Sequence, residues 1–345
     1  MKKLVATLIA LSALSAFALT GCTTNPSPSP TATPNPDTIT IKEESVTIGA
    51  GTEYELGGTL TIPEGAEKPY PSVVLVHGSG PNDRDETIYG NKPFKDIADY
   101  LTSKGIAVLR YDKRTYAHQA KMVESFMEIT VKDETTDDAI LASNLLKSDE
   151  RMDKDRVFII GHSMGGMLAP RIDAEGGDFA GLILLAGSPR TLSDIVLDQI
   201  TAAVETLTGE QKALGQQQLD GLTSIFEELD NISDEEAKVL DMGGASAYYF
   251  KEMAEHTASS YLSDIEKPVL ILQGGKDFQV YADKDYVEYQ NLLDGKPNVT
   301  FKLYPELNHL FMTSTTGTAE EYMKADNVHI EVLVDIAEWI LNAKK

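Results

Sequence analysis

Short apolar runs alternate with amphipathic stretches over most of this chain. The runs resemble strands that are covered on both faces, and they lie at 72–77, 106–111, 157–160, 181–186, 268–273 and 299–304. Between them apolar residues recur at helical spacing, most clearly at 94–104 and 330–340. Repeated strand, helix, strand units predict an α/β fold with a mainly parallel sheet and helices on both of its faces.

Two segments add to this pattern. Residues 38–62 are rich in Thr, Val and Ile and are broken by glycines, which predicts an antiparallel opening of two or three strands. Ahead of the run at 157–160, Thr135 and Thr136 are expected to cap a helix that runs through Leu146. The domain is therefore expected to begin with its antiparallel part and to continue as alternating strands and helices.

One long interval has no strand-like run. Between residues 186 and 268 the apolar positions follow helical spacing, and the interval is far longer than an ordinary connection. We expect a helical cap at about 190–264, inserted over the end of the sheet. Its aromatic run, Tyr248, Tyr249 and Phe250, has two interpretations: it lines an acyl pocket, or it forms the core of the insertion itself.

The run at 157–160 ends in Gly161-His162-Ser163-Met164-Gly165, and a helix is expected to follow. A serine between two glycines at this spacing fits a strained strand-to-helix turn, where bulkier neighbours would clash with the backbone. Such a turn exposes the Ser163 hydroxyl at the sheet edge. It also aims the first N–H groups of the helix at whatever lies in front, which suits a developing negative charge. Ser163 is therefore the candidate nucleophile.

A serine nucleophile needs a base and an acid, and candidates for both follow later strands. Asp277 comes shortly after the run at 268–273, and His309 comes shortly after the run at 299–304. Because the carboxyl ends of parallel strands meet at one edge of a sheet, Ser163, Asp277 and His309 are expected to converge. The imidazole would accept the serine proton, and the carboxylate would fix its tautomer. The order Ser, Asp, His is that of α/β-hydrolases.

Other histidines and aspartates compete for these two roles. The His162 side chain is expected to point away from the serine hydroxyl, and His77 is expected to support a loop by hydrogen bonding. Asp264 precedes its strand, and Asp283 is expected near a helix N-terminus, where a carboxylate has a capping role. The remaining histidines are interpreted as surface or satisfied core residues: His118, His256 and His329.

The tetrahedral intermediate of acyl transfer needs two backbone N–H groups around its oxyanion. One is expected from Met164, directly after the nucleophile. The other is expected from the loop that follows the run at 72–77. Gly78 and Ser79 both remain candidates there, and Ser79 is the favoured one.

Five segments together resemble the α/β-hydrolase superfamily: His77-Gly78-Ser79-Gly80, Arg110-Tyr111-Asp112-Lys113-Arg114, Gly161-His162-Ser163-Met164-Gly165-Gly166, Gln273-Gly274-Gly275-Lys276-Asp277 and Asn308-His309. Residues 77–86 are also similar to a bacterial esterase branch related to dienelactone hydrolases. The resemblance covers about residues 38–345. It implies the α/β-hydrolase fold, with an eight-stranded sheet and a cap, and Ser163, Asp277 and His309 as the triad. Dienelactone hydrolases proper use a Cys nucleophile, so lactone hydrolysis is not carried over to this chain.

The N-terminus has the pattern of an exported protein. Lys2 and Lys3 precede an apolar run over 4–19, which is short and rich in alanine for a membrane span. This pattern predicts a signal peptide over residues 1–21. An ordinary secretory signal cleaved near Ala16 is the alternative to the lipoprotein signal described next.

Leu19-Thr20-Gly21-Cys22 resembles the bacterial lipobox, which implies that Cys22 becomes the lipidated first residue of the mature protein. Cys22 is the only cysteine, so the fold holds no internal disulfide. Residues 22–37 are expected to form the lipidated Cys and a Pro-, Ser- and Thr-rich linker, ahead of the catalytic domain at 38–345. We expect this domain to be lipid-anchored at the extracytoplasmic face of a bacterial membrane.

The formal net charge is −24, and removal of Lys2 and Lys3 with the signal peptide leaves 28 basic against 54 acidic residues, or −26. So acidic a surface disfavours nucleic acid as a partner. The histidines are scattered, and neither a metal nor a cofactor is expected. The sequence leaves the oligomeric state open, as it does the choice between inner and outer membrane.

The leading hypothesis is a serine carboxylic-ester hydrolase that acts on small acyl esters through an acyl-enzyme. A serine peptidase, an aminopeptidase or an acyl-transferase would use the same triad, and the triad alone does not discriminate between them. A lipoprotein that binds a ligand without turnover is the alternative from another class. It has no need of three converging catalytic side-chain types, and this favours an enzyme.

Overall fold

The computed structural model describes residues 39–343, so the predictions for residues 1–37, Cys22 included, lie outside it. Eight strands form one sheet: β1 (Thr40–Ile48), β2 (Leu56–Glu64), β3 (Tyr70–Val76), β4 (Ala107–Tyr111), β5 (Met152–His162), β6 (Leu182–Leu185), β7 (Val269–Gly274) and β8 (Val299–Tyr304). The helices are α1 (Pro93–Ser103), α2 (Arg114–Ala117), α3 (Gln119–Glu124), α4 (Asp137–Ser148), α5 (Met164–Ile172), α6 (Leu192–Thr206), α7 (Gly209–Glu227), α8 (Asp234–Lys238), α9 (Ala247–Glu255), α10 (Ala258–Leu262), α11 (Val287–Leu292) and α12 (Ile330–Asn342). Between residues 39 and 343, no helix combines the length and the apolar character needed to cross a membrane.

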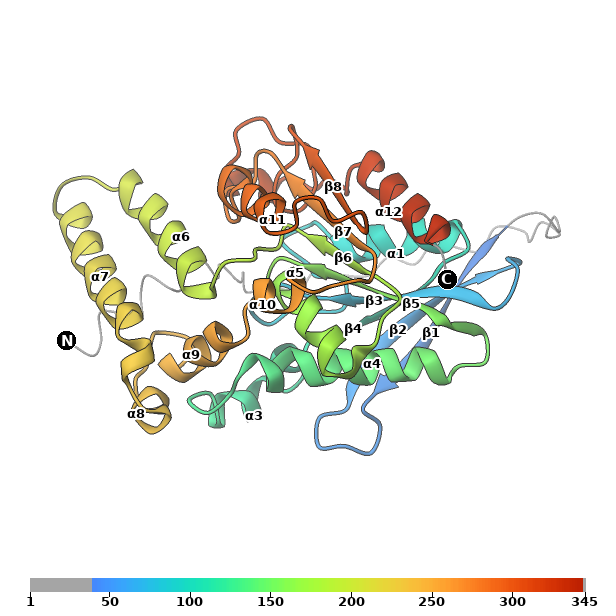
Figure 1. Ribbon diagram of the computed structural model, residues 1–345, viewed down its shortest axis with the longest axis horizontal. Coiled ribbons are helices and arrows are strands. Elements are labelled where there is room, and N and C mark those ends of the chain that lie inside the picture. Colours follow the sequence, from blue (N-terminus) through green and yellow to red (C-terminus); the bar gives the residue numbers. More distant parts are fainter. Residues whose placement is uncertain (1–38, 344–345) are drawn as a thin grey trace, which may run out of the picture.

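The sheet has the order β1-β2-β4-β3-β5-β6-β7-β8 (Figure 1). β1 pairs with β2 and β2 with β4 in antiparallel fashion, whereas the pairs from β4 through to β8 are all parallel. The antiparallel opening thus consists of two strands. The mainly parallel, eight-stranded sheet is confirmed, with β1 and β8 as its edges.

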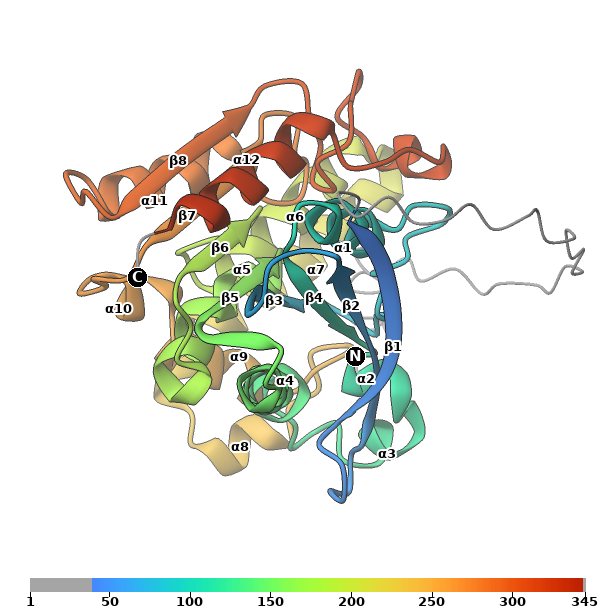
Figure 2. The same cartoon turned by 90° about the vertical axis from the view of Figure 1, so that its right-hand side faces the viewer.

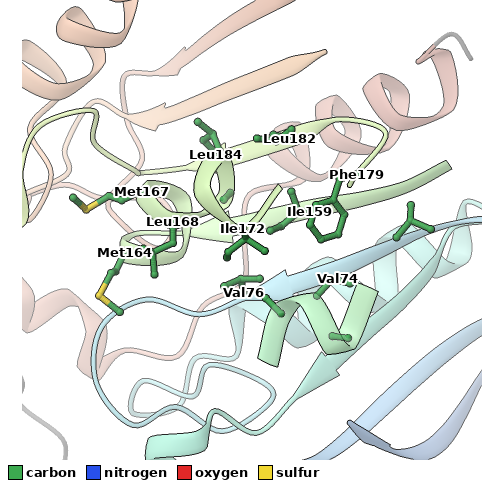
Figure 3. Close-up of a cluster of buried hydrophobic side chains, with 14 of the residues drawn as sticks. Val74, Val76, Ile159, Met164, Met167, Leu168, Ile172, Phe179, Leu182 and Leu184 are labelled. Atoms are coloured by element: carbon green, nitrogen blue, oxygen red, sulfur yellow. The ribbon is translucent and has the colours of Figure 1, made fainter. Parts of the chain in front are cut away.

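Alternate side chains of the buried strands face two separate cores. Val74 and Val76 of β3 pack with α4 and α5 on one face, and Val73 and Leu75 pack with α1 and α12 on the other. Figure 2 shows α1 and α12 on the opposite side of the sheet from α4. Figure 3 shows the first core, in which α5 lies over the central strands. Helices cover both faces of the sheet, and this explains why its inner strands β3, β6 and β7 are buried along their whole length rather than at alternate positions.

The predicted cap interval contains the helices α6 to α10, and α6, α7 and α8 extend away from the sheet (Figure 1). These three helices and α9 share a small apolar core of their own, with Val204, Leu222 and Phe250 among its members. Tyr248 packs against this core, whereas Tyr249 belongs to the core of the sheet. The aromatic run is therefore divided between the two regions.

The prediction that Thr135 and Thr136 cap a helix is wrong. Thr136 already has helical dihedral angles, and the chain enters α4 from a π-helical turn over Lys132–Thr136. Both hydroxyls are buried without a hydrogen-bond partner among the described residues. A residue within a continuous helix cannot act as its N-cap, because a cap needs a non-helical backbone conformation.

Candidate active site

Ser163 lies on the turn that joins β5 to α5, at the carboxyl end of the strand. Its φ of 55° and ψ of −119° are a conformation that residues with a Cβ rarely adopt. The glycines around it allow close backbone packing: a Cβ on Gly161 would lie 2.1 Å from the Gly165 carbonyl oxygen, and one on Gly165 would lie 2.2 Å from the Val76 carbonyl oxygen. The local sequence therefore specifies the strained turn expected for a nucleophilic serine.

Asp277 and His309 meet at the ends of the adjacent strands β7 and β8. His309 Nδ1 lies 2.7 Å from Asp277 Oδ2, and both side chains are buried. Asp277 Oδ1 accepts the backbone N–H groups of Gln279 and Val280 at 2.8 and 2.9 Å, and Gln273 Nε2 donates to Oδ2 at 3.0 Å. These donors fix the carboxylate, and the carboxylate in turn fixes the orientation of the imidazole.

The turn that carries His309 is attached to the strand that carries the serine. Asn308 Oδ1 accepts the N–H groups of Leu310 and Met312 at 3.0 and 3.2 Å, and the carbonyl oxygen of His309 lies 2.9 Å from His162 Nε2. Residue 162 directly precedes Ser163, so the backbone of His309 lies beside the nucleophile turn. Among the hydrogen bonds of residues 39–343, none joins the Ser163 and His309 side chains.

The loop after β3 lies directly against the nucleophile. A Cβ on Gly78 would be 3.1 Å from the Ser163 Cβ. The Gly78 N–H donates to Glu86 Oε1 at 2.8 Å, while its carbonyl oxygen accepts from Lys113 Nζ at 3.0 Å. Asn82 Nδ2 adds a second, longer bond to this carbonyl at 3.3 Å. The C=O and N–H of one planar trans peptide point in opposite directions, so these donors turn the Ser79 N–H away from themselves.

A polar cluster beside Met164 is absent from our sequence predictions. The buried Lys113 Nζ lies 2.9 Å from Glu134 Oε1, and the Tyr249 hydroxyl donates to the same carboxylate at 3.2 Å. Tyr249 also lies 3.4 Å from Met164 Sδ, which the Ser79 hydroxyl approaches to 3.6 Å. Burial, and then the nearby Glu134 carboxylate, raise the pKa of Tyr249 well above its ordinary value. The one sequence signal for this cluster is a lysine placed just after a buried strand.

His77 lies at the start of the loop after β3, and its support of this loop by hydrogen bonding stays a prediction. Its ring packs against Phe94 and Tyr111, and its Nε2 is buried without a hydrogen-bond partner among the described residues. Burial lowers the pKa of His77 to about 4, an effect that the nearby Glu86 carboxylate only partly offsets. The ring is therefore neutral at pH 7.

The other competing residues lie outside this constellation. Asp264 is exposed ahead of β7, and Asp283 is exposed in the first turn of a π-helical segment. His118 and His256 follow α2 and α9, and His329 precedes α12. Over residues 39–343, no group of three or more His, Cys, Asp or Glu side chains is arranged to hold a metal ion.

A family model described as serine aminopeptidase, S33, matches residues 67–315, which include the nucleophile turn, Asp277 and His309. The chain belongs to this family. A similar family relative is esterase EstD of Thermotoga maritima, which is 38% identical over 306 residues, or 87% of this chain and 68% of that protein. With this membership and this relative, the chain is a serine hydrolase.

Solved structures with a similar fold are more distant in sequence. Est1E from Butyrivibrio proteoclasticus is 17% identical with a TM-score of 0.56, over 87% of this chain and 98% of that one. The Pyrococcus furiosus esterase Pf2001 is 16% identical with a TM-score of 0.54, over 94% and 100%. The dienelactone hydrolase from Anabaena variabilis is 17% identical with a TM-score of 0.50, over 88% and 99%. These likenesses concern the fold, and they confirm the predicted α/β-hydrolase architecture.

Proposed function

We propose that this chain is a serine carboxylic-ester hydrolase in which Ser163 is the nucleophile, His309 the base and Asp277 the acid. The observation that carries the proposal is the 2.7 Å contact between His309 Nδ1 and Asp277 Oδ2, next to a serine on a strained turn. Because Nδ1–H donates a hydrogen bond to the carboxylate, the proton of the neutral ring is on Nδ1 and the lone pair is on Nε2. This is the tautomer that a base for Ser163 needs.

The reaction has two matched halves. Ser163 Oγ attacks the ester carbonyl carbon while His309 Nε2 takes the hydroxyl proton, and the imidazolium then gives this proton to the departing alcohol. The acyl group remains on Ser163. Water repeats the sequence and releases the carboxylic acid. The Ser163 and His309 side chains close the remaining gap when substrate binds, since catalytic hydrogen bonds often tighten only in the substrate complex.

Met164 and Ser79 supply the N–H groups for the oxyanion. Met164 is the first residue of α5, where backbone N–H groups lack partners within the helix. Of the two candidates in the loop after β3, Gly78 uses its N–H on Glu86, and this favours Ser79. In known serine hydrolases, removal of one such donor lowers kcat by a factor of roughly 10²–10³.

The 38% identity with a protein named an esterase favours ester over amide substrates. A peptidase or aminopeptidase remains the second candidate, because the family model is described as a serine aminopeptidase. Glu134, which approaches the site through Tyr249, is neutralised by Lys113 and so offers little attraction to a free substrate amine. A screen of aryl esters of increasing acyl length, run beside aminoacyl amides, decides between the two. Faster turnover of the amides would overturn the ester assignment.

Labelling with a fluorophosphonate tests the serine chemistry itself. We expect one label per chain on Ser163, and none in the Ser163→Ala variant or after denaturation. Intact-protein and peptide mass spectrometry measure this directly. Absence of label from the folded wild-type protein would favour the non-catalytic, ligand-binding alternative.

We also propose that the enzyme is exported and held by a lipid on Cys22 at the extracytoplasmic face of a bacterial membrane. The support is the apolar run that ends at the single cysteine, followed by a Pro-rich linker. Two or more acyl chains on this residue would anchor the domain stably, where one chain would not.

The variant Cys22→Ser tests the anchor. We expect it to release an active enzyme from the membrane fraction, because the catalytic domain would keep its fold without the lipid. Fractionation followed by an ester assay measures both properties, with the wild-type protein as the control. A Cys22→Ser variant that stays in the membrane fraction would contradict the anchor while leaving the hydrolase proposal intact.

A further inference from the structure

Glu86 is a buried carboxylate that our serine mechanism does not use. Its backbone has a φ of 52°, a left-handed conformation that a residue with a long side chain rarely adopts. The side chain is folded under the loop after β3, where Oε1 accepts the Gly78 N–H at 2.8 Å. The other oxygen, Oε2, lies 2.9 Å from His162 Nδ1 in an ion-pair contact that lacks hydrogen-bond alignment, and neither atom has a hydrogen-bond partner among the described residues.

The second ring nitrogen of His162, Nε2, contacts the backbone of the base. This nitrogen lies 2.9 Å from the carbonyl oxygen of His309, which only accepts hydrogen bonds, so Nε2 carries a proton. Burial lowers the pKa of His162, but the charge of Glu86 outweighs it and the net shift is upward. Burial likewise raises the pKa of Glu86, and the charge of His162 outweighs it, so the net shift is downward. Each group therefore favours the charged form of its partner, a carboxylate facing an imidazolium.

The buried surroundings of Glu86 and His162 make this ion pair unfavourable for the stability of the fold. His162 and Glu86 are 5% and 2% exposed, and both border an enclosed cavity of about 10 Å³ whose other walls include Phe94, Leu310 and Phe311. Two charges in so apolar a place lose hydration that their attraction only partly restores, and well-packed apolar residues often serve stability as well or better. A strained, buried ion pair next to a nucleophile points to a functional role.

We propose that Glu86 and His162 are positioning residues that tie the oxyanion loop to the base. Glu86 holds the Gly78 peptide, which precedes the Ser79 N–H, and His162 holds the His309 backbone. The two groups that act on one substrate carbonyl are thereby fixed to a common frame. This inference rests on the proposed function, and neither residue touches the reacting atoms.

The variant Glu86→Gln keeps an acceptor for the Gly78 N–H but removes the negative charge that faces His162, so it breaks the link between the two residues. We expect kcat for an aryl ester to fall by about 10², the order expected for a 1 Å misplacement of catalytic groups, with KM changed little. The rate of fluorophosphonate labelling should fall in parallel. A residue that only stabilises the fold would lower the melting temperature without this change in kcat.

Asp173→Asn is the matched control. Asp173 accepts the Phe179 N–H at 2.7 Å and pairs with Lys267 at 2.9 Å, in the same way that Glu86 serves Gly78 and His162. It lies at the amino-terminal edge of the parallel strands, opposite the site. We expect this variant to lose stability and to keep the wild-type kcat.

Two variants at residue 162 keep the test decisive if Glu86→Gln fails to fold. The His162→Gln variant would retain a side-chain donor for the His309 carbonyl, whereas the His162→Ala variant would not, so His162→Gln should exceed His162→Ala in kcat by at least about tenfold. Equal kcat values for the two folded variants, or a wild-type kcat in folded Glu86→Gln, would overturn the positioning role. If wild-type protein is still labelled at Ser163, the proposed function survives that result. Failure of the wild type to label would instead remove the proposed function, and the inference with it.

Discussion

The body of the enzyme and its cap are built on different principles. In the body, two large apolar cores cover the faces of one sheet, and every residue of the proposed triad lies where a strand of that sheet ends. In the cap, α6, α7 and α8 share only a small core, and α7 exposes most of its surface. The proposed chemistry is thus specified by the region with the larger apolar cores, and the cap is joined to that region by part of its surface.

Some of the contacts between the cap and the body are apolar, because Ile195, Met253 and Leu262 of the cap helices belong to the core of the sheet. Others are polar. Arg171 of α5 is buried and donates to Glu252 of α9 at 3.0 Å, and Arg190 at the start of the cap lies 2.8 Å from Asp285 of the body. Tyr249 is the cap side chain that reaches Met164. Breaking one partner of a buried ion pair is strongly destabilising, so these polar links add to the apolar contacts in fixing where the cap sits.

The largest expected effect belongs to the body. Ser163→Ala should lower kcat for an aryl ester by about 10³ to 10⁶, because removal of one triad member disables the whole unit. The melting temperature should change little. Steady-state kinetics and thermal unfolding of the same preparation measure both quantities, and ester hydrolysis at the wild-type rate would contradict the assignment.

The same substitution, leucine to alanine, should distinguish the core of the sheet from the core of the cap. Leu184→Ala in β6 should lower the free energy of unfolding by about 2–5 kcal/mol, the usual range for a buried leucine. Leu222→Ala in α7 should instead open the cap locally, with faster proteolysis there and a smaller shift of the main transition. Urea unfolding and limited proteolysis measure the difference. Equal shifts of one common transition would show that cap and body unfold as a unit.

Acid sensitivity should also arise in the body. The pKa of His77 is lowered to about 4 in the fold, so between pH 6.5 and 4 the unfolded chain binds a proton that the folded chain does not. Folding stability is therefore lost as the pH falls through this window, by about 3 kcal/mol for this group. Between pH 6.5 and 4, the free energy of unfolding should fall by about 3 kcal/mol more in the wild type than in the His77→Gln variant. Parallel curves for the two proteins would argue against a neutral, buried His77.

The smallest effect tests the link between the two regions. Tyr249→Phe removes a hydroxyl that donates to Glu134 but keeps the ring in the core. We expect kcat/KM to fall roughly fivefold. This corresponds to a loss of about 1 kcal/mol of transition-state stabilisation, the usual contribution of one hydrogen bond. Glu134 keeps its partner Lys113, which limits the cost. Kinetics with short and long acyl esters would show whether the change depends on acyl length. A loss of 10² or more would give Tyr249 a direct part in the chemistry.

The sequence predicted the inner strands well because they are apolar runs, and the run at 106–111 differs from β4 by one residue. The run at 299–304 coincides with β8, but the expectation that both faces of this strand are covered is wrong, because β8 is an edge strand with exposed residues. The sequence also predicted that Asp277 and His309 would meet, although their catalytic roles stay predictions. It missed the contacts of Glu86 and Tyr249, since each joins residues that lie far apart in the chain and differ in side-chain type. The prediction that Thr136 is a helix N-cap failed for a related reason, because the π-helical turn ahead of α4 has no simple sequence pattern.

The two open edges of the sheet bear on how this protein behaves when crowded. β1 places the exposed Lys42 and Glu43 at one edge, with the half-buried Glu44 beside them, and β8 exposes Lys302 at the other. A foreign strand laid along either edge would have to strip water from these charges, which discourages runaway strand addition. The charges on β1 and β8 thus oppose the addition of a further strand at the two edges of the sheet.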